Sequence, residues 1–183
     1  MASGRLRPDF VPGLIAPVSR NTFIALGSNL GDSPKLIRDA MHRLEALSDQ
    51  PLLRSGLWRS SPINCPPGAP PFVNAVVGLV PRAGQTPEAL LENLQVLEKE
   101  FGRQPKQVLN EPRLLDLDLI AFGRETRSTP RLTLPHPRAH QRRFVLEPLN
   151  EIAPDFLLPG QTKSIRQLLA GLHTEEVLTR LSC

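Results

Sequence analysis

The chain has no tyrosine, one tryptophan and only two cysteines among its 183 residues. So few aromatic rings argue against an extended stacking surface for single-stranded nucleic acid. Cys65 lies in a proline-rich loop and Cys183 ends the chain. Their spacing is typical of neither a metal site nor a disulfide framework, so we expect a reducing, cytoplasmic setting.

The sequence also lacks any apolar run close to the about 18–20 residues that cross a membrane, and we expect no membrane partner. Residues 1–20 lack the continuous apolar core of a secretory signal, and we interpret them as a flexible N-terminal extension. The length predicts one domain over residues 21–183. The net charge is +4, and 18 of the 22 basic residues are arginine. Because the planar guanidinium group binds phosphate well, this composition fits a polyanionic small ligand or a nucleic acid equally.

Hydrophobic periodicity predicts the order β-α-β-β-α-β. The strands are expected at 22–26, 52–60, 72–80 and 113–123, and the helices at 33–47 and 86–101. This order is typical of the ferredoxin-like arrangement of the α+β class, a mostly antiparallel sheet with helices packed on one face. The rest of the chain predicts a strand at 132–134 and short helices at 144–152, 165–172 and 176–181, the first of them interrupted by Pro148.

Within residues 112–120, leucines alternate with Asp116 and Asp118, the period of two that is typical of a strand. The two carboxylates therefore lie on one face, about 6.6 Å apart along the strand, where each raises the pKa of the other. Hard oxygen ligands on a rigid strand suit Mg²⁺ held together with substrate phosphates. The alternative is a half-exposed strand with its acids in solvent, since this two-acid pattern is short and common.

Five arginines lie in predicted loops around this strand. They are either a phosphate clamp or ordinary soluble surface. The five are Arg103, Arg113, Arg131, Arg142 and Arg143.

For the other candidate site residues, a structural role is also possible. Gln95 and Glu98 share one face of the second helix and are either a solvated stripe or nucleotide ligands. His136 is held between two prolines, but no second histidine or cysteine has a spacing suited to a metal. Phe72 and Phe144 are either core residues or stack on a flat ring.

Six motifs occur together in one order: 22–30, 58–62, 72–77, 112–118, 134–137 and 142–149. Together they resemble the 6-hydroxymethyl-7,8-dihydropterin pyrophosphokinases of folate biosynthesis, over about residues 21–172. Each motif alone is weak, but six in this order make the resemblance highly specific. It implies the same ferredoxin-like α+β fold. It also implies transfer of the pyrophosphoryl group of ATP to the hydroxymethyl oxygen of the reduced pterin, giving AMP and the pterin pyrophosphate.

The resemblance also implies roles for individual residues. Asp116 and Asp118 bind two Mg²⁺ ions that bridge ATP and the attacking hydroxyl, and Arg103 and Arg113 join them as catalytic residues. The implied ATP site contains Gln95, Glu98, Arg103, Arg113, Leu119, Arg131, Thr133, His136 and Arg142. The implied pterin site contains Phe72 and Phe144 as the two stacking rings and Ser60, Ser61, Pro62, Ile63 and Asn74 at the hydrogen-bonding edge. Phosphoryl-type transfer depends on positioning and charge neutralisation more than on a strong base, which fits a sequence without an obvious Ser-His pair.

The chain departs from the family pattern before its acidic strand. Family members usually carry Trp-Gly there, where this chain has Asn110-Glu111. The loop after Arg103, which closes over the reactants in this family, is also poorer in arginine than usual. We therefore predict weaker ATP binding or slower closure than in a member with the full motif. Comparable nucleotide affinity of the wild type and Asn110→Trp would contradict this prediction.

Three other functions compete with this interpretation of the sequence. Nucleotidyltransferases place a Gly-Ser turn shortly before their acids, whereas Gly27-Ser28 precedes Asp116 by almost ninety residues. A nucleic-acid-binding ferredoxin-like domain needs aromatic side chains on its open face, where this chain has acids that repel phosphate. A degenerate homologue that binds ATP and pterin without turnover stays open. We expect a monomer without a nucleic-acid partner. The resemblance to the family also implies a separate dihydropteroate synthase that consumes the product.

Overall fold

The computed structural model describes residues 22–61, 68–103 and 112–182. The predictions for residues 1–20, Pro62, Ile63 and Asn110-Glu111 therefore lie outside the described residues. The elements are β1 (Thr22–Ser28), α1 (Ser33–Glu45), β2 (Leu53–Arg54), β3 (Trp58–Ser60), β4 (Phe72–Leu79), α2 (Pro87–Glu100), β5 (Asp116–Phe122), β6 (Arg127–Ser128), β7 (Thr133–Leu134), the 3-10 helix η2 (Ala139–Gln141), α3 (Arg143–Ile152), α4 (Ile165–Ala170) and β8 (Leu178–Arg180).

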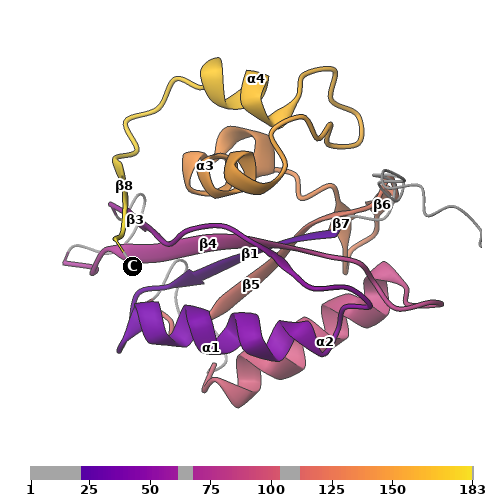
Figure 1. Ribbon diagram of the computed structural model, residues 1–183, viewed down its shortest axis with the longest axis horizontal. Coiled ribbons are helices and arrows are strands. Elements are labelled where there is room, and N and C mark those ends of the chain that lie inside the picture. The colour runs from indigo at the N-terminus through magenta and orange to yellow at the C-terminus, as the bar shows by residue number, and fades with distance from the viewer. Residues whose placement is uncertain (1–21, 62–67, 104–111, 183) are drawn as a thin grey trace, which may run out of the picture.

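The main sheet has the strand order β5-β1-β4-β3-β8, and β2 pairs with the end of β4. The strand pairs along this order are antiparallel. The predicted βαββαβ order and the ferredoxin-like α+β fold are thereby confirmed. Helices α1 and α2 cover one face of the sheet, whereas α3 and α4 lie on the other face (Figure 1).

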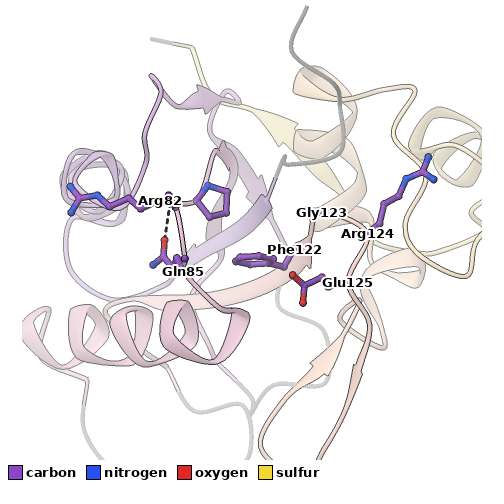
Figure 2. Close-up of a pocket in the computed structure, with 9 residues that line it drawn as sticks. Arg82, Gln85, Phe122, Gly123, Arg124 and Glu125 are labelled. Carbon is purple, nitrogen blue, oxygen red and sulfur yellow. Dashed lines mark hydrogen bonds between the residues drawn. The ribbon is translucent and has the colours of Figure 1, made fainter.

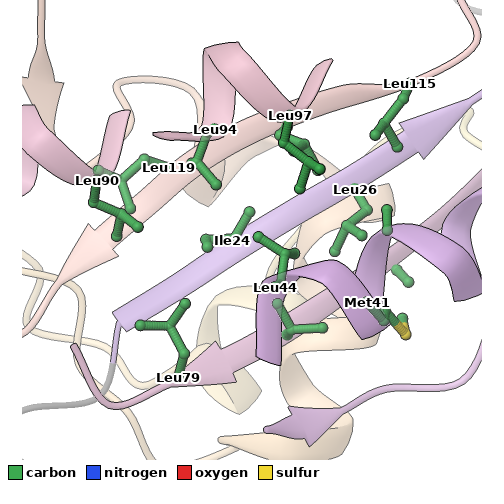
Figure 3. Close-up of a cluster of buried hydrophobic side chains, with 14 of the residues drawn as sticks. Ile24, Leu26, Met41, Leu44, Leu79, Leu90, Leu94, Leu97, Leu115 and Leu119 are labelled. Carbon is green, nitrogen blue, oxygen red and sulfur yellow. The ribbon is translucent and has the colours of Figure 1, made fainter. Parts of the chain in front are cut away.

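A separate apolar core lies on each face of the sheet. Ile24, Leu26 and Leu119 pack against Leu44 of α1 and Leu94 of α2 (Figure 3). On the opposite face, the second core contains Phe23, Val76, Ile120, Val145, Leu149 and Phe156. Since both faces are buried over much of its length, β4 is almost continuously apolar rather than alternating.

Local capping residues set the starts of the first two helices, and α1 ends at Glu45, two residues before its predicted end. The Asp32 carboxylate caps α1 by accepting a hydrogen bond from the Lys35 amide at 3.2 Å, and the Thr86 hydroxyl caps α2 through the Ala89 amide at 3.1 Å. Beyond α2, Gly102 has a φ of 85°, which favours glycine. The end of α2 therefore leads the chain to Arg103, near the start of β5.

The structure corrects several of the remaining predictions. The strand expected at 52–60 is two short strands, because between them the Ser55 hydroxyl and amide bond to Val76 of β4. The helix expected at 176–181 is wrong, since residues 178–180 pair with β3 as strand β8. The strand at 132–134 is confirmed as β7, although only over two residues, and the helix expected at 165–172 ends at Ala170. Helix α3 continues through the buried Pro148, because a proline removes a single helical hydrogen bond there.

Candidate active site at the start of β4 and β5

The register of the central strands brings three polar side chains to one face of the sheet. Gly27 of β1 is paired with Asn74 on one side and with Asp116 on the other, and Ala25 is paired with Asp118. Directly paired residues project from the same face. Asn74, Asp116 and Asp118 therefore face the side of the sheet that also carries α3, and Gly27 puts no side chain between them.

Two arginines neutralise Asp116. Arg113 Nη1 lies 2.9 Å from Asp116 Oδ2, and Arg103 Nη1 lies 3.3 Å from Asp116 Oδ1. Asp118 is less well compensated, because Arg142 Nη1 is 3.8 Å from its Oδ2. Burial, and then the charge of Asp116, raise the pKa of Asp118. The charge of Asp116 is thus the second cause of the raised pKa of Asp118, after burial.

Glu98 at the end of α2 is buried, with only 3% of its surface exposed. Its Oε1 accepts a hydrogen bond from the Leu117 amide of β5 at 2.8 Å and is paired with Arg103. Burial raises the pKa of this carboxyl group, which the bond from Leu117 and the charge of Arg103 oppose. The interpretation as a solvated stripe is wrong for Glu98, whereas Gln95 is exposed. A signal was available in the sequence, because Glu98 follows Leu94 by four residues on the apolar face of α2.

The start of α3 adds a second group of cations. The Arg142 guanidinium lies over the Phe144 ring, 5.4 Å from its centroid. Its pKa is lowered by burial and then by the charge of Arg138. The His136 amide donates a hydrogen bond to the Ile120 carbonyl at 2.8 Å, which holds this residue against β5. Burial lowers the pKa of His136, and the charge of Asp118 opposes this shift.

The structure describes five of the predicted pterin-binding residues, and only some of these five contact each other. The Asn74 side-chain amide donates a hydrogen bond to the Ser60 hydroxyl at 2.8 Å, and both residues are buried. Phe72, which is paired with Ser60 across the sheet, and Phe144 are both partly exposed. Ser61 is exposed beside this pair.

Three other predicted ATP-binding residues, and Arg143 of the five arginines, are buried in the core, exposed or paired with another residue. The Leu119 side chain is buried in the core against α2, so only its backbone is available to a ligand. Arg131 is exposed and forms an ion pair of 3.0 Å with Glu92 of α2, and Thr133 is exposed as well. Arg143 is bound to Glu147 within α3 and not to the acidic pair.

Sequence reasoning missed Asn29, which holds Arg113 in place. The Asn29 side-chain oxygen accepts a hydrogen bond from the Arg113 amide at 2.8 Å, and the Asn29 amide donates to the Arg113 carbonyl at 3.1 Å. The only signal was the position of Asn29 in the turn after the first strand. These two residues are 84 positions apart, so their contact could not be predicted locally.

A hollow of about 340 Å³ lies at the other end of β4 and β5, lined by residues 81–85 and 122–125. Arg82 and Arg124 point away from each other there (Figure 2). Without converging charges, this hollow has none of the chemistry of the acidic face.

The acidic pair is suited to a divalent metal. No group of three or more histidine, cysteine, aspartate or glutamate side chains that could hold a metal occurs in the described part of the chain. Two carboxylates fit a hard cation that completes its coordination with phosphate oxygens and water. The raised pKa of Asp118 fits such a site, because a nearby cation would offset both burial and the charge of Asp116, which raise that pKa.

Comparison with known proteins decides the family. The sequence model of the 7,8-dihydro-6-hydroxymethylpterin-pyrophosphokinase family matches residues 23–154. The chain belongs to this family. The chain is similar to two bacterial proteins that carry the name 2-amino-4-hydroxy-6-hydroxymethyldihydropteridine pyrophosphokinase. The one from Synechocystis is 37% identical over 163 residues, covering 85% of this chain and 82% of the relative. The one from Pseudomonas aeruginosa is 37% identical over 159 residues, covering 86% and 95%.

Longer relatives match over part of their length. The folic acid synthesis protein of Pneumocystis carinii is 39% identical over 143 residues, which are 78% of this chain but 19% of that protein. A solved structure of Plasmodium falciparum HPPK-DHPS with pteroate has a TM-score of 0.62 at 13% identity, covering 82% of this chain and 43% of that one. An HPPK-DHPS complex with substrates has a TM-score of 0.65 at 11% identity, covering 83% and 43%. At these identities the structures establish the fold.

The predicted enzyme class, a pyrophosphokinase of the folate pathway, is confirmed by the family and its named members. Over the described ranges, none of the helices is both long enough and apolar enough to span a bilayer. The cytoplasmic setting, the monomeric state and the individual site residues stay predictions.

Proposed function

We propose that this pyrophosphokinase transfers the pyrophosphoryl group of ATP to 6-hydroxymethyl-7,8-dihydropterin in a Mg²⁺-dependent reaction, giving AMP and the pterin pyrophosphate. The observation that carries the proposal is the shared face of the sheet. It holds the acidic pair Asp116 and Asp118, and it also holds the buried pair Ser60 and Asn74. The half proposed to bind phosphate and the half proposed to bind the flat pterin ring thus share one face of the sheet.

The phosphate half is built from compensated charges. Asp116 and Asp118 would hold the metal, which when bound neutralises phosphate charge and orients the reacting oxygens. Arg103 and Arg113, now paired with Asp116, present planar guanidinium groups that match phosphate oxygens. Glu98 holds Arg103 at this place, since it is anchored in turn by the Leu117 amide.

Arg142 and His136, which precede α3, complete the phosphate half. Arg142 lies close to both Asp118 and the Phe144 ring, where its guanidinium group could contact a phosphate. Burial lowers the pKa of His136, which favours the neutral imidazole, and a neutral imidazole could donate a hydrogen bond to a phosphate. This arrangement suits a transfer that depends on positioning and charge neutralisation.

The pterin half uses the hydrogen bond between Asn74 and Ser60. Because the Ser60 hydroxyl accepts from the Asn74 amide at 2.8 Å, the orientation of that amide is determined before a ligand arrives. A preorganised amide can read the donor and acceptor pattern along the edge of a pterin. The Phe144 side chain would stack on the pterin ring from the side of α3. The Phe72 side chain is predicted to stack on its other face.

The test mixes the purified protein with ATP, Mg²⁺ and 6-hydroxymethyl-7,8-dihydropterin and separates AMP from ADP by chromatography. We expect pterin-dependent AMP, and we expect Asp118→Asn to lower its rate about 100-fold or more. This variant should fold at least as well as the wild type, because burial already disfavours the ionised Asp118. Asp39→Asn on α1, an exposed acid paired with Lys35, is the matched control and should keep full activity.

Other outcomes would refute part or all of the proposal. Tight pterin binding in the presence of an ATP analogue, without any AMP, would identify the degenerate homologue. Neither AMP nor pterin binding would overturn the proposal entirely. ADP in place of AMP would refute pyrophosphoryl transfer specifically.

A further inference from the structure

Residues 173–181, which we call the C-terminal strap, run from α4 back to the sheet and end beside β3 (Figure 1). The strap contains β8, which is paired antiparallel with β3. Several of its side chains are exposed, and Val177 is 65% exposed. The strap is therefore held by its hydrogen bonds as well as by the partly buried Leu181, which packs against the core.

The first bond ties the strap to the start of α3. Glu176 Oε2 accepts a hydrogen bond from the Phe144 backbone amide at 3.2 Å. Amides in the first turn of a helix have no acceptor within the helix, and a carboxylate there is also favoured by the helix dipole. The charge of Glu176 is also close enough to Arg142 to favour the cationic form of that arginine. Glu176 thus acts as a cap for α3 that is supplied from a distant part of the sequence.

The next residues tie the strap to the opposite wall of the predicted pterin site. The Ser61 amide donates a hydrogen bond to the Val177 carbonyl at 3.3 Å. Leu178 is paired with Ser60, whose hydroxyl holds the Asn74 amide. Three consecutive residues of the strap therefore contact Phe144 on one side and Ser60 and Ser61 on the other.

The far end of the strap is fastened independently. Arg180 Nε lies 2.8 Å from Oε1 of Glu151 in the last turn of α3, and the other oxygen of Glu151 accepts from the Gly56 amide at 2.6 Å. The Leu181 amide also donates to the Leu57 carbonyl at 2.8 Å. Loss of the Glu176 contact alone should therefore leave the strap attached and alter only the end near Phe144.

We infer that Glu176 is a positioning residue of the pterin site, which sets the distance between the Phe144 ring and the Ser60–Asn74 pair. This inference rests on the proposed function. The carboxylate fixes the first turn of α3, and the adjoining Val177 and Leu178 fix β3, so a single segment spans both walls. Glu176 acts through Phe144 and not on the phosphates, and its removal should weaken pterin binding more than ATP binding.

The experiment measures the dissociation constant of 6-hydroxymethylpterin by fluorescence, with a saturating non-hydrolysable ATP analogue. The affinity for that analogue is measured separately by calorimetry. We expect Glu176→Ala to weaken pterin binding about fivefold, the equilibrium equivalent of one lost helix cap, and to change analogue binding less than about twofold. The matched control is Glu175→Ala, an exposed acid next to it on the strap, which should bind pterin like the wild type.

Two further variants distinguish the effect of the length of the Glu176 side chain from the effect of its charge. Glu176→Gln keeps the length and an acceptor, and it should restore most of the pterin affinity. Glu176→Asp keeps the charge but is one methylene shorter, and it should behave like the alanine variant. If Glu176→Ala does not fold by circular dichroism, the comparison of these two variants decides the question. Equal pterin affinity of Glu176→Asp and the wild type would overturn the inference.

A double-mutant cycle tests the route of action. If Glu176 acts through Phe144, adding Glu176→Ala to Phe144→Ala should weaken pterin binding no further. Additive losses would overturn the role through Phe144. Wild-type protein that binds no pterin would overturn the proposed function and this inference with it, whereas equal binding by the wild type and all Glu176 variants would overturn the inference alone.

Discussion

Replacing Glu98 by alanine or by glutamine removes the same charge. The two variants differ in whether the Leu117 amide keeps a hydrogen-bond acceptor. In the wild type that amide donates to Glu98 Oε1 at 2.8 Å, and Leu117 is 5% exposed. Glutamine keeps an oxygen acceptor at this position, whereas alanine leaves the amide without one. A buried amide without an acceptor costs about 1–3 kcal/mol of folding free energy. Glu98→Ala should therefore be less stable than Glu98→Gln by that amount.

Thermal unfolding followed by circular dichroism measures this difference. For a domain of this size, about 1 kcal/mol shifts the midpoint by about 2–4 °C, so the two variants should differ by about 2–12 °C. Glu100→Ala is the matched control on the same helix. It breaks an exposed ion pair with Arg43, which is worth at most about 1 kcal/mol.

The dependence on pH gives a second, independent check. Burial raises the pKa of Glu98 in the folded protein, so the folded state binds this proton more tightly than the unfolded state. The stability that this group contributes is fully present below its unfolded pKa of about 4.3 and is lost as the pH rises through the higher folded pKa. Glutamine does not titrate. The stability of Glu98→Gln relative to the wild type should therefore increase between pH 4 and pH 7.

Two results would refute this reasoning. Equal midpoints of Glu98→Ala and Glu98→Gln at neutral pH would show that the Leu117 amide does not need its acceptor. A constant difference between the wild type and Glu98→Gln across the pH range would show that burial does not raise the pKa of Glu98.

Further predictions concern the two halves of the site. Arg142→Ala should weaken binding of an ATP analogue about 10- to 100-fold, since a hydrogen bond to a charged group contributes about 1.5–3 kcal/mol. Calorimetry with the exposed Arg166→Ala as control checks this, and unchanged affinity would exclude Arg142 from the phosphate site. Ser60→Ala removes the acceptor that orients the Asn74 amide, and it should weaken pterin binding about 2- to 10-fold. In a fluorescence titration, the exposed Ser128→Ala should match the wild type, and equal binding by Ser60→Ala would contradict the role of that hydroxyl.

The central elements of the fold could be predicted because their signals are local. Leucine spacing gave α1 and α2, alternation gave β5, and Asp32 and Thr86 marked the helix starts. Strand β8 could not be predicted in this way. Its sequence fits a helix equally well, and its pairing with β3 depends on backbone hydrogen bonds to a distant segment.

The candidate site shows the same division. That Asp116 and Asp118 project from one face follows from the period of two along a strand, and the sequence alone determined it, together with the positions of α1, α2 and β5. Only the tertiary structure decided that Arg113 neutralises Asp116 while Asp118 is left poorly compensated, and that Glu98 is buried. It also decided that Glu176 reaches Phe144, 32 residues away. Such contacts depend on how whole elements pack against each other, which local periodicity does not encode.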